Sequence, residues 1–342
     1  MNHINIIAEA GVNHNGKLKL AYKLVDLAKK CGADFVKFQT SIPELHISKI
    51  AKKANYQIRN TQKKETQLEM IKKISLSYDQ FKNIKKYCQS KKINFLSTPF
   101  DLQSIDFLNT LNMKYFKIPS GEITNLPYLI KVGKLKKKII LSTGMSNMKE
   151  IGQALKVLIF NGTLKKNITV LQCNTEYPTP FRHVNLRAML SIRKKYKVNV
   201  GYSDHTNGIE ASLAAAALGA SMIEKHITLN TNLPGPDHKA SASLKDLAII
   251  CDFAKRIDAM MGDGIKKPSN AEKPNKDLIR KSAYVNVSSI KKGDVFNENL
   301  YSCKRPYNPL LIPPENIEMF IGHKFNKNKK FDDGICLSDF TC

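Results

Sequence analysis

Two short stretches place histidines where apolar runs end. In GYSDHT, Gly201–Thr206, a hydroxyl, a carboxylate and an imidazole follow one another as Ser203, Asp204 and His205. In MIEKHIT a second imidazole, His226, lies 21 residues further on (226 minus 205). Imidazole nitrogens bind divalent metals, and oxygen ligands complete the shell. If both runs are neighbouring strands, the two histidines are candidates to bind one metal ion.

Other apolar runs also end in polar side chains. Two of these are lysines, Lys37 and Lys117, and ammonium groups accompanied by hydroxyls and amides are suited to hold a phosphate and a carboxylate. The full set at the ends of the runs comprises Glu9, Asn13, His14, Lys37, Gln39, Ser97, Thr98, Lys117, Ser120, Glu122, Ser142, Thr143, Asn174, Glu176, Tyr177, Ser203, Asp204, His205, Glu224, Lys225 and His226.

The elements that position these residues repeat one pattern. Short runs of strand-forming residues alternate with segments of helical period, and Gly32 and Gly219 stand where helix C-caps are expected. This order predicts a parallel, closed (β/α)8 barrel, with a doubly wound open sheet as the alternative. No GxGxxG loop follows the first strand. The expected strands are 4–11, 34–40, 93–100, 115–122, 138–145, 169–178, 198–205 and 222–228, and helical period is seen at 18–32, 77–91 and 209–220.

In such a barrel the carboxyl ends of all strands face one cavity, so residues distant in sequence meet there. Each residue alone has an ordinary structural explanation. A single histidine is commonly a hydrogen-bonded structural residue, and a lysine after a strand is commonly a surface charge. The Ser-Thr pairs of LSTPF and LSTGM are typical N-caps, and Glu122 is placed to interact with a helix dipole. The shared position at one end of every strand is what favours a functional site.

Composition restricts the class of protein. The chain has 342 residues, 42% hydrophobic and 25% charged, as in globular proteins with a large core. No apolar run approaches the length needed to span a bilayer, and the N-terminus lacks the pattern of a signal peptide, so we expect a cytoplasmic protein without membrane contact. The seven cysteines form no CxxC pair, which argues against a disulfide framework or zinc knuckle.

The formal net charge of +26 suggests anionic partners. The lysines, however, are spread along the chain in twos and threes rather than gathered in one block. This favours a lysine-rich solvated surface over nucleic-acid binding, and we expect no nucleic-acid partner. A basic protein still favours small anionic substrates.

The composition changes after the last expected helix. The segment 262–282 is rich in Lys, Asn and Pro and has little apolar periodicity, as in linkers. Beyond it, short strands are expected around a KKGD turn. The sequence therefore predicts a barrel over 1–265, a linker over 266–281 and a small, mostly β domain over 282–342.

Motifs along nearly the whole chain resemble the bacterial sialic acid (nonulosonate) synthase family, which includes N-acetylneuraminate and N,N'-diacetyllegionaminate synthases. They are AEAGVNHNG, VKFQT, FLSTPFD, FKIPSGEITN, ILSTGM, CNTEYPTP, GYSDHT, EKHIT, PGPDHKAS and CKRP.

The resemblance implies condensation of phosphoenolpyruvate with the open-chain aldehyde of an N-acylated mannosamine-type sugar, giving a nine-carbon 2-keto acid and phosphate. It implies a divalent ion, Mn²⁺ or similar, on His205 and His226. It also implies proton transfer by Glu9 and Glu122. By the same resemblance Lys37, Thr98, Lys117, Ser120, Ser142 and Ser203 hold phosphoenolpyruvate, Asn174 and Tyr177 contact substrates, and Gln39, Glu122 and Asp237 line the sugar side.

The tail resembles the antifreeze-like SAF domain that ends these synthases. The resemblance implies a domain-swapped homodimer in which Arg305 of CKRP reaches the sugar of the partner subunit. The sequence departs from the family just downstream, where KRPYNPLLIPPENI lacks the usual glycine. This difference affects the placement of Arg305.

Two other functions stay open at the level of sequence. One is another barrel synthase or aldolase that makes a different keto-sugar acid from phosphoenolpyruvate or with a metal. The other, remote, is a basic nucleic-acid-binding protein. Within the family, LNTNLPGPDHKAS and QIRNTQKKETQLEM favour 2,4-diacetamido-2,4,6-trideoxymannose over N-acetylmannosamine as the sugar.

Overall fold

The computed structural model describes residues 3–341, and the chain divides into two compact units. The first unit ends at Gly262 and the second begins at Asp263. Each has its own hydrophobic core. The break follows directly after a long helix, α11, which ends at Met261.

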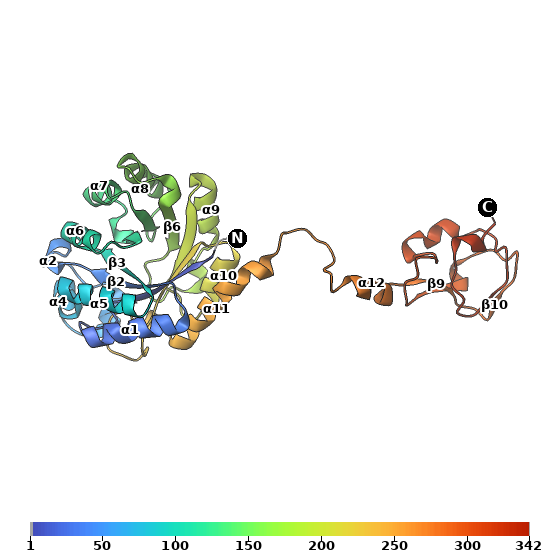
Figure 1. Ribbon diagram of the computed structural model, residues 1–342, viewed down its shortest axis with the longest axis horizontal. Coiled ribbons are helices and arrows are strands. Elements are labelled where there is room, and N and C mark those ends of the chain that lie inside the picture. The colour runs from blue at the N-terminus through green and yellow to red at the C-terminus, as the bar shows by residue number, and fades with distance from the viewer. Residues whose placement is uncertain (1–2, 342) are drawn as a thin grey trace. The chain divides into compact units, whose positions relative to one another are not determined.

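The first unit is a barrel of eight parallel strands (Figure 1). The strands pair in the order β3-β2-β1-β8-β7-β6-β5-β4, and β3 and β4 at the two ends of this order lie against each other. The predicted (β/α)8 architecture is therefore confirmed as a nearly closed parallel barrel. The strands are β1 (Asn5–Gly11), β2 (Phe35–Thr40), β3 (Asn94–Pro99), β4 (Tyr115–Ile118), β5 (Lys138–Ser142), β6 (Ile168–Cys173), β7 (Asn199–Asp204) and β8 (Met222–His226).

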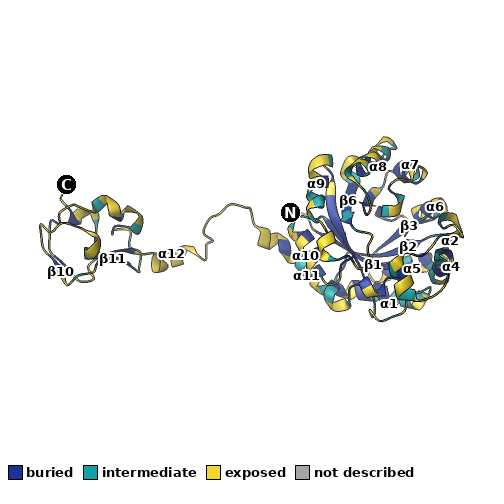
Figure 2. Ribbon diagram, turned by 180° about the vertical axis from the view of Figure 1, so that it is seen from behind, coloured by how far each residue is buried: buried dark blue, intermediate teal, exposed yellow. Residues whose placement is uncertain are grey.

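Helices surround the strands, with buried faces inward and exposed faces outward (Figure 2). In α1, Leu24, Val25 and Ala28 share the buried stripe, as the helical period predicts. The helix ends at Gly32 in the left-handed region, φ 82°, where the glycine N–H donates to helix carbonyls. The surrounding helices are α1 (Leu18–Cys31), α5 (Tyr78–Ser90), α6 (Leu102–Thr110), α7 (Leu126–Lys134), α8 (Met148–Phe160), α9 (Arg187–Tyr196), α10 (Glu210–Ala217) and α11 (Leu244–Met261).

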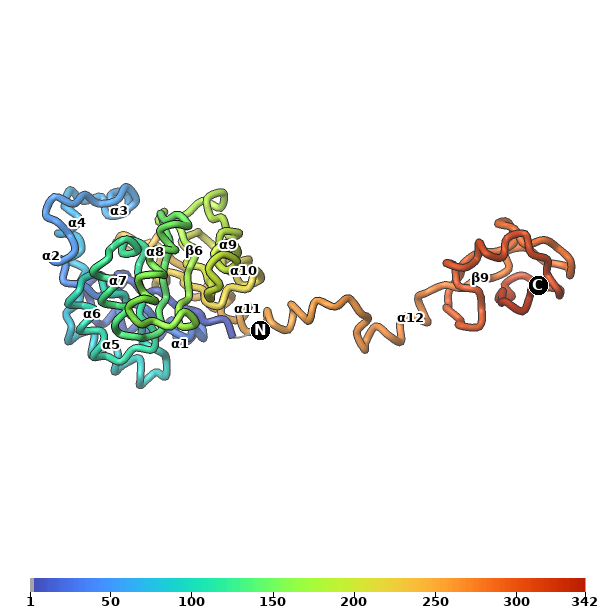
Figure 3. Tube along the Cα trace, turned by 90° about the horizontal axis from the view of Figure 1, so that it is seen from above, coloured from blue at the N-terminus to red at the C-terminus, as the bar shows by residue number. Residues whose placement is uncertain are grey.

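A long excursion separates β2 from β3, and we call residues 41–77 the arm. It holds three short helices, α2 (Pro43–His46), α3 (Asn55–Thr61) and α4 (Gln67–Ile74). Figure 3 shows these helices together on one side of the barrel, and α2 packs against α4. A capping box starts α4, because Thr66 Oγ1 accepts from the Glu69 N–H and Glu69 Oε2 accepts from the Thr66 N–H.

Successive residues of the strands face opposite sides of the barrel wall. On the outer side of β7 and β8, Lys225 Nζ lies 2.9 Å from Asp204 Oδ2 and donates to the Thr206 carbonyl. Ser212 of α10 donates to the same Asp204 oxygen at 2.6 Å. All of these side chains are buried. This ion pair therefore joins two strands to a helix behind the barrel interior.

The second unit is built from short strands and 3-10 turns. Its antiparallel pairs are β9 (Ser282–Val285) with β11 (Tyr301–Lys304), and β10 (Ser289–Ile290) with β12 (Lys329–Lys330). The segment expected to be a linker contains a short helix, α12 (Lys273–Ile279), none of whose residues is buried. Aromatic and branched side chains fill the small core, namely Ala283, Val285, Ile290, Phe296, Ile312, Ile317, Phe325, Ile335 and Phe340.

Across residues 3–341, no helix combines the length and hydrophobicity that crossing a bilayer requires.

The close approach of β7 to its neighbours explains the glycine that opens GYSDHT. A Cβ at Gly201 would lie 2.4 Å from the Met222 carbonyl oxygen of β8 and 2.7 Å from Leu171 of β6. Backbone atoms do not give way at such distances. We expect Gly201→Ala to lower the free energy of unfolding of the barrel by about 1 to 3 kcal/mol, measured by urea denaturation.

The matched control is Gly121→Ala, because a Cβ at Gly121 meets nothing within 4 Å. Its free energy of unfolding should stay within about 0.5 kcal/mol of the wild type. Equal effects of the two substitutions would contradict the steric explanation.

Candidate active site

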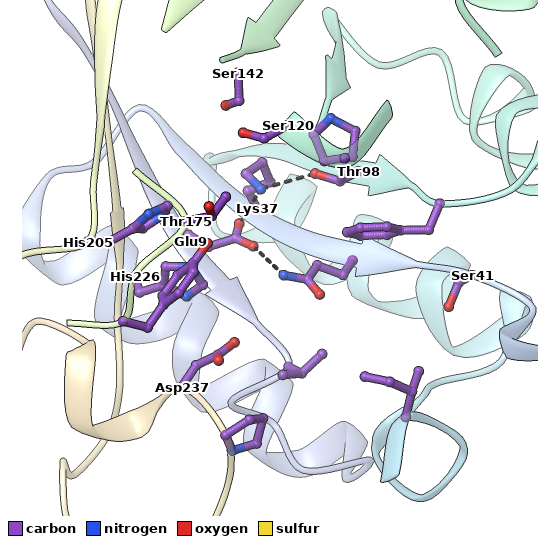
Figure 4. A pocket seen from close by; sticks show the side chains of 18 of the residues that line it. Glu9, Lys37, Ser41, Thr98, Ser120, Ser142, Thr175, His205, His226 and Asp237 are labelled. Atoms are coloured by element: carbon purple, nitrogen blue, oxygen red, sulfur yellow. Dashed lines mark hydrogen bonds and ion pairs between the residues drawn. The ribbon is translucent and has the colours of Figure 1, made fainter. Parts of the chain in front are cut away.

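A cavity of about 340 Å³ lies at the carboxyl ends of the barrel strands, and every strand supplies or precedes a residue that lines it (Figure 4). The structure brings most of the residues expected from the sequence to this one place. They are Glu9, Lys37, Gln39, Thr98, Lys117, Ser120, Ser142, Tyr177, Ser203, His205, His226 and Asp237.

Strand alternation decides which residues of GYSDHT and EKHIT reach the cavity. Ser203 and His205 line it, whereas Asp204 between them faces the outer side, where it pairs with Lys225. Asp204 of GYSDHT and Lys225 of EKHIT thus have a structural role. The same period of two places Glu224 beside His226 in the cavity.

The floor of the cavity holds two buried ammonium groups against two buried carboxylates. Lys37 Nζ lies 2.7 Å from Glu9 Oε2 and 3.8 Å from Glu224 Oε1. Lys117 Nζ lies 3.1 Å from the same Glu224 oxygen, which also accepts from Ser203 Oγ at 3.1 Å. Ammonium groups cost several kcal/mol each to bury unless they are paired, so the carboxylates are what keep the lysines charged inside the barrel.

Sequence reasoning assigned no role to Glu224, although its spacing of two residues from His226 was available as a signal. Its contacts place it at the centre of the cluster. Burial by itself raises the pKa of its carboxyl, but Lys117 and Lys37 more than offset this and hold the pKa below its usual range. Glu224 is therefore the ionised counterion of both lysines.

Glu9 differs electrostatically from Glu224. Burial raises the pKa of Glu9, and Lys37 offsets the rise only in part, while the negative charge of Glu224 adds to it. The other oxygen, Oε1, accepts from Gln39 Nε2 at 3.2 Å. Of the two floor carboxylates, Glu9 is thus the one suited to take up and release a proton.

Hydroxyl groups surround the lysines. Thr98 Oγ1 accepts from Lys37 Nζ at 3.0 Å, and Ser120 Oγ accepts from the Gly144 N–H at 2.9 Å. Ser142 Oγ is buried and has no hydrogen-bond partner among residues 3–341. Buried polar groups are nearly always satisfied, so an unpartnered hydroxyl in the same cavity as two ammonium groups marks a place for an anionic ligand.

The two expected metal ligands lie side by side, with imidazole centroids 5.5 Å apart. His205 Nδ1 donates to the Asn174 carbonyl, which leaves Nε2 unprotonated, and His226 Nδ1 is buried without a hydrogen-bond partner in the described chain. Burial lowers the pKa of His205 to about 4 and that of His226 well below its usual range. Both rings are neutral at pH 7, as metal ligands must be.

These two imidazoles can supply only some of the ligands that a divalent ion needs. Within residues 3–341, no group of three or more His, Cys, Asp or Glu side chains is arranged to hold a metal. The remaining ligands would have to be substrate or water oxygens. The Asn174 carbonyl accepts from His205 Nδ1 and so fixes the ring orientation, as backbone carbonyls commonly do for histidines that bind metals.

Three other expected residues lie elsewhere. Asn174 acts on the site through its backbone, and its side-chain amide donates to the His183 carbonyl at 2.8 Å. Glu122 does not line the cavity, and its Oε2 accepts from Asn125 Nδ2 at 2.6 Å. Arg305 belongs to the second unit, where its Nε donates to the Ile279 carbonyl at 3.0 Å.

The arm contributes residues that sequence reasoning did not identify. Tyr56 stacks on Tyr177 with ring centroids 4.9 Å apart, and Tyr177 packs on His205 at 4.1 Å. Asn60 of α3 donates to the Pro236 carbonyl at 2.6 Å, on the far side of the cavity mouth. The side chains from the arm that line the cavity are Ser41, His46, Ile47, Tyr56, Gln57, Gln67, Ile71, Ile74 and Ser75.

A parallel barrel with lysines, carboxylates, hydroxyls and paired imidazoles at its carboxyl ends defines an enzyme that acts on an anionic small molecule. The model of the NeuB family matches residues 24–266, and the chain belongs to that family. The resemblance drawn from the motifs is thereby confirmed.

Similar proteins cover nearly the whole chain. It is 53% identical to the N,N'-diacetyllegionaminic acid synthase of Campylobacter jejuni over 330 residues, 96% of this chain and 98% of that protein. It is 40% identical to the synthase of the same description from Legionella pneumophila, covering 94% and 90%. Among solved structures, N-acetylneuraminic acid synthetase from Leptospira borgpetersenii, crystallised with citrate, matches with a TM-score of 0.69 at 32% identity, covering 80% and 90%.

Asp237 gives the cavity a testable pH dependence. Burial raises the pKa of its carboxyl from 3.8 to about 7. The folded protein thus binds a proton that the unfolded chain has released, and stability falls as the pH rises through this window. We expect Asp237→Asn to gain stability relative to the wild type between pH 4 and pH 8, by at least about 1 kcal/mol, in urea denaturation at several pH values.

The control is Asp277→Asn, at an exposed residue of α12. Because this side chain is exposed, the control reports the effect of an aspartate-to-asparagine change outside the cavity. A difference for Asp237→Asn that is constant from pH 4 to pH 8 would show that the carboxyl is not desolvated.

Proposed function

We propose that this enzyme is a nonulosonate synthase, a transferase that condenses phosphoenolpyruvate with an open-chain N-acylated mannosamine-type sugar. The sugar is 2,4-diacetamido-2,4,6-trideoxymannose, and the products are N,N'-diacetyllegionaminate and phosphate. The observation that carries this proposal is the pair of buried lysines surrounded by hydroxyls at one end of the cavity. Identity of 53% over nearly the full length to a protein described as N,N'-diacetyllegionaminic acid synthase supports the choice of sugar over N-acetylmannosamine.

The reaction makes one carbon–carbon bond, and it replaces the bond from C2 to the phosphate oxygen by a bond from C2 to an oxygen of water. C3 of phosphoenolpyruvate attacks the aldehyde carbon of the sugar, and the aldehyde oxygen takes a proton. Water adds to C2, which carries positive charge, and the bond from C2 to the phosphate oxygen breaks. One water molecule is consumed, and phosphate and a 2-keto acid are released.

Lys37 and Lys117 bind the phosphate and carboxylate of phosphoenolpyruvate, with hydroxyl donors around them. They lie already desolvated and paired in the cavity floor, so little reorganisation is needed when the anion binds. The unsatisfied Ser142 hydroxyl supplies a further hydrogen bond. We assign Lys37, Thr98, Lys117, Ser120, Ser142 and Ser203 to this end.

The carboxylates supply the proton chemistry. Glu9 is buried next to Lys37 with a raised pKa, which suits proton transfer to the aldehyde oxygen or from the added water. We assign the second proton-transfer role to Glu122, next to the cavity-lining Ser120 and Gly121. Gln39, Asn174, Tyr177 and Asp237 are assigned to the sugar and the adjoining wall.

His205 and His226 would hold a divalent ion, Mn²⁺ in our proposal. When bound there it acts as a Lewis acid that polarises the sugar carbonyl. The chain itself contributes two neutral imidazoles, one of them oriented by the Asn174 carbonyl. Tyr177, packed on the His205 ring, shields the same place from water.

The direct test is phosphate release from phosphoenolpyruvate with Mn²⁺, comparing 2,4-diacetamido-2,4,6-trideoxymannose with N-acetylmannosamine, and with a chelator as control. Release that depends on sugar and metal, with a higher kcat/KM for the diacetamido sugar, is the expected result. Equal or higher kcat/KM for N-acetylmannosamine would instead make N-acetylneuraminate the product. No release with either sugar would overturn the proposed reaction.

We expect His205→Ala and His226→Ala each to lower metal-dependent turnover by more than about 100-fold, because each removes a ligand without disturbing the core. The control is His3→Ala, whose half-exposed side chain pairs with Asp34 away from the cavity. Turnover is measured as phosphate release across a Mn²⁺ titration. Wild-type turnover in either cavity variant would contradict the metal assignment.

We propose further that the second unit is an SAF domain and that the enzyme is a domain-swapped homodimer in the cytoplasm. The small core, short antiparallel strands and 3-10 turns of this unit support the domain assignment. The cysteines among residues 3–341 are free thiols, which suits a reducing compartment. In the dimer, Arg305 extends from one subunit to the sugar bound in its partner.

Arg305→Ala should raise the KM for the sugar about 10-fold to 100-fold and leave the KM for phosphoenolpyruvate nearly unchanged, because one charged hydrogen-bond donor to the sugar is lost. Lys330→Ala, at another exposed cation of the second unit, is the control. Initial rates with each substrate varied separately distinguish the two constants. Equal effects on both substrates, or none, would contradict the role of Arg305.

A further inference from the structure

The end of the cavity formed with the arm has a lining unlike that of the floor. Apart from the imidazole of His46, its side chains are apolar or carry neutral polar groups, whereas the lysines, the carboxylates and the other imidazoles come from the strands, their carboxyl ends and the loop after β8. Figure 4 shows Ser41, the first residue of the arm, on the opposite side of the cavity from His205 and His226. The neutral set is Val12, Ser41, Ile47, Gln67, Ile71, Ile74 and Ser75.

Helix α4 presents one face to this end. Gln67, Ile71 and Ile74 follow one another at spacings of four and three residues, so they lie along a single stripe. Leu68 and Met70, between them, are buried against the protein instead. The two isoleucines are only half-buried because the cavity leaves their outer atoms uncovered. They therefore offer apolar surface to a substrate.

Three of the seven lysines of the arm are paired with acids of the arm. Lys72 Nζ lies 2.6 Å from Glu44, and Lys73 and Lys53 lie 2.5 Å and 3.8 Å from Glu65. No lysine or arginine of the arm, paired or not, lines the cavity. A phosphate or carboxylate at this end would therefore meet apolar side chains without a lysine or arginine to balance it.

Contacts across the mouth hold the arm over the cavity. Asn60 donates to the Pro236 carbonyl, and Tyr56 stacks on Tyr177. With the aldehyde carbon next to His205 and His226, the open chain of the sugar extends away from the histidines. Under the proposed function, a sugar chain that extends toward Ser41 brings its last carbon, C6, next to the arm.

We propose that Val12, Ile47, Ile71 and Ile74 form a neutral subsite that binds C6 of the sugar and selects substrates in which C6 is a methyl group. This inference rests on the proposed function and identifies the residues that select a 6-deoxy substrate. A hydrophobic pocket favours a methyl over a hydroxymethyl group by up to about 100-fold in kcat/KM. It rejects a C6 phosphate more strongly, since both phosphate charges would be desolvated without a partner.

The test compares two sugars that differ only at C6, N-acetylmannosamine and its 6-deoxy derivative, by phosphate release with the full-length enzyme. We expect the wild type to favour the 6-deoxy sugar by about 10-fold to 100-fold in kcat/KM. Ile74→Ser and Ile71→Ser should each reduce this ratio about 3-fold to 10-fold, because a methyl then packs against a hydroxyl. The control Ile58→Ser changes an exposed residue of α3 that does not line the cavity, and it should keep the wild-type ratio.

A variant that gains activity toward a new substrate cannot be explained by loss of structure, so it provides a second test. Ile74→Lys introduces a cation at the proposed subsite, so it should raise kcat/KM for N-acetylmannosamine 6-phosphate at least 10-fold relative to the wild type. The same substitution at Ile58 should not.

The outcomes separate the two proposals. Phosphate release with unchanged sugar ratios in the Ile71 and Ile74 variants, and no gain for the 6-phosphate, would overturn the subsite and leave the synthase assignment intact. A wild type that releases no phosphate with any sugar would overturn the synthase assignment, and the subsite with it.

Discussion

The site depends on two lysine ammonium groups held inside a barrel, away from bulk water. Such groups remain charged only because Glu224 lies between them and Glu9 contacts one of them. Removing Glu224 would leave the buried Lys117 without its carboxylate partner, which is among the most costly single changes in a protein interior. The same arrangement provides the chemistry, since an anion that enters finds cations already fixed and already stripped of water. Stability and anion binding are thus two aspects of one cluster.

The strands that carry this cluster serve both sides of the barrel wall. On β7 and β8, inward residues face the cavity, while Asp204 and Lys225 join the strands to α10 from behind. The outer ion pair fixes the backbone from which Ser203 and His226 project. Whether a strand residue has a structural or a functional role therefore depends on which side of the barrel wall its side chain faces. Residue type alone does not distinguish these two roles.

Much of the barrel could be predicted because strand runs and helical stripes are local properties of the sequence. It could also be predicted that one cavity would contain Lys37, Lys117, His205 and His226, because parallel strands bring their carboxyl ends together. The central place of Glu224 did not follow, because it depends on distances between β2, β4 and β8. The stretch QIRNTQKKETQLEM of the arm was connected with the choice of sugar, but the position of the arm at the cavity was missed for a similar reason, because it rests on contacts such as that of Asn60 with Pro236, 176 residues apart. Nor did the Lys-rich composition of 266–281 reveal α12, whose first turn begins at Lys273 followed by a proline.

The arm is a single continuous stretch of chain inserted between two strands, and its own ion pairs and capping box stabilise it locally. The residues that surround the reacting groups lie on strands outside that stretch. Most of the proposed C6 subsite, namely Ile47, Ile71 and Ile74, is consequently encoded in a different part of the sequence from the lysines, carboxylates and histidines of the cavity. Exchange of one contiguous segment among homologues, by recombination or by design, is a short evolutionary route to a new sugar that leaves the chemistry of the barrel in place.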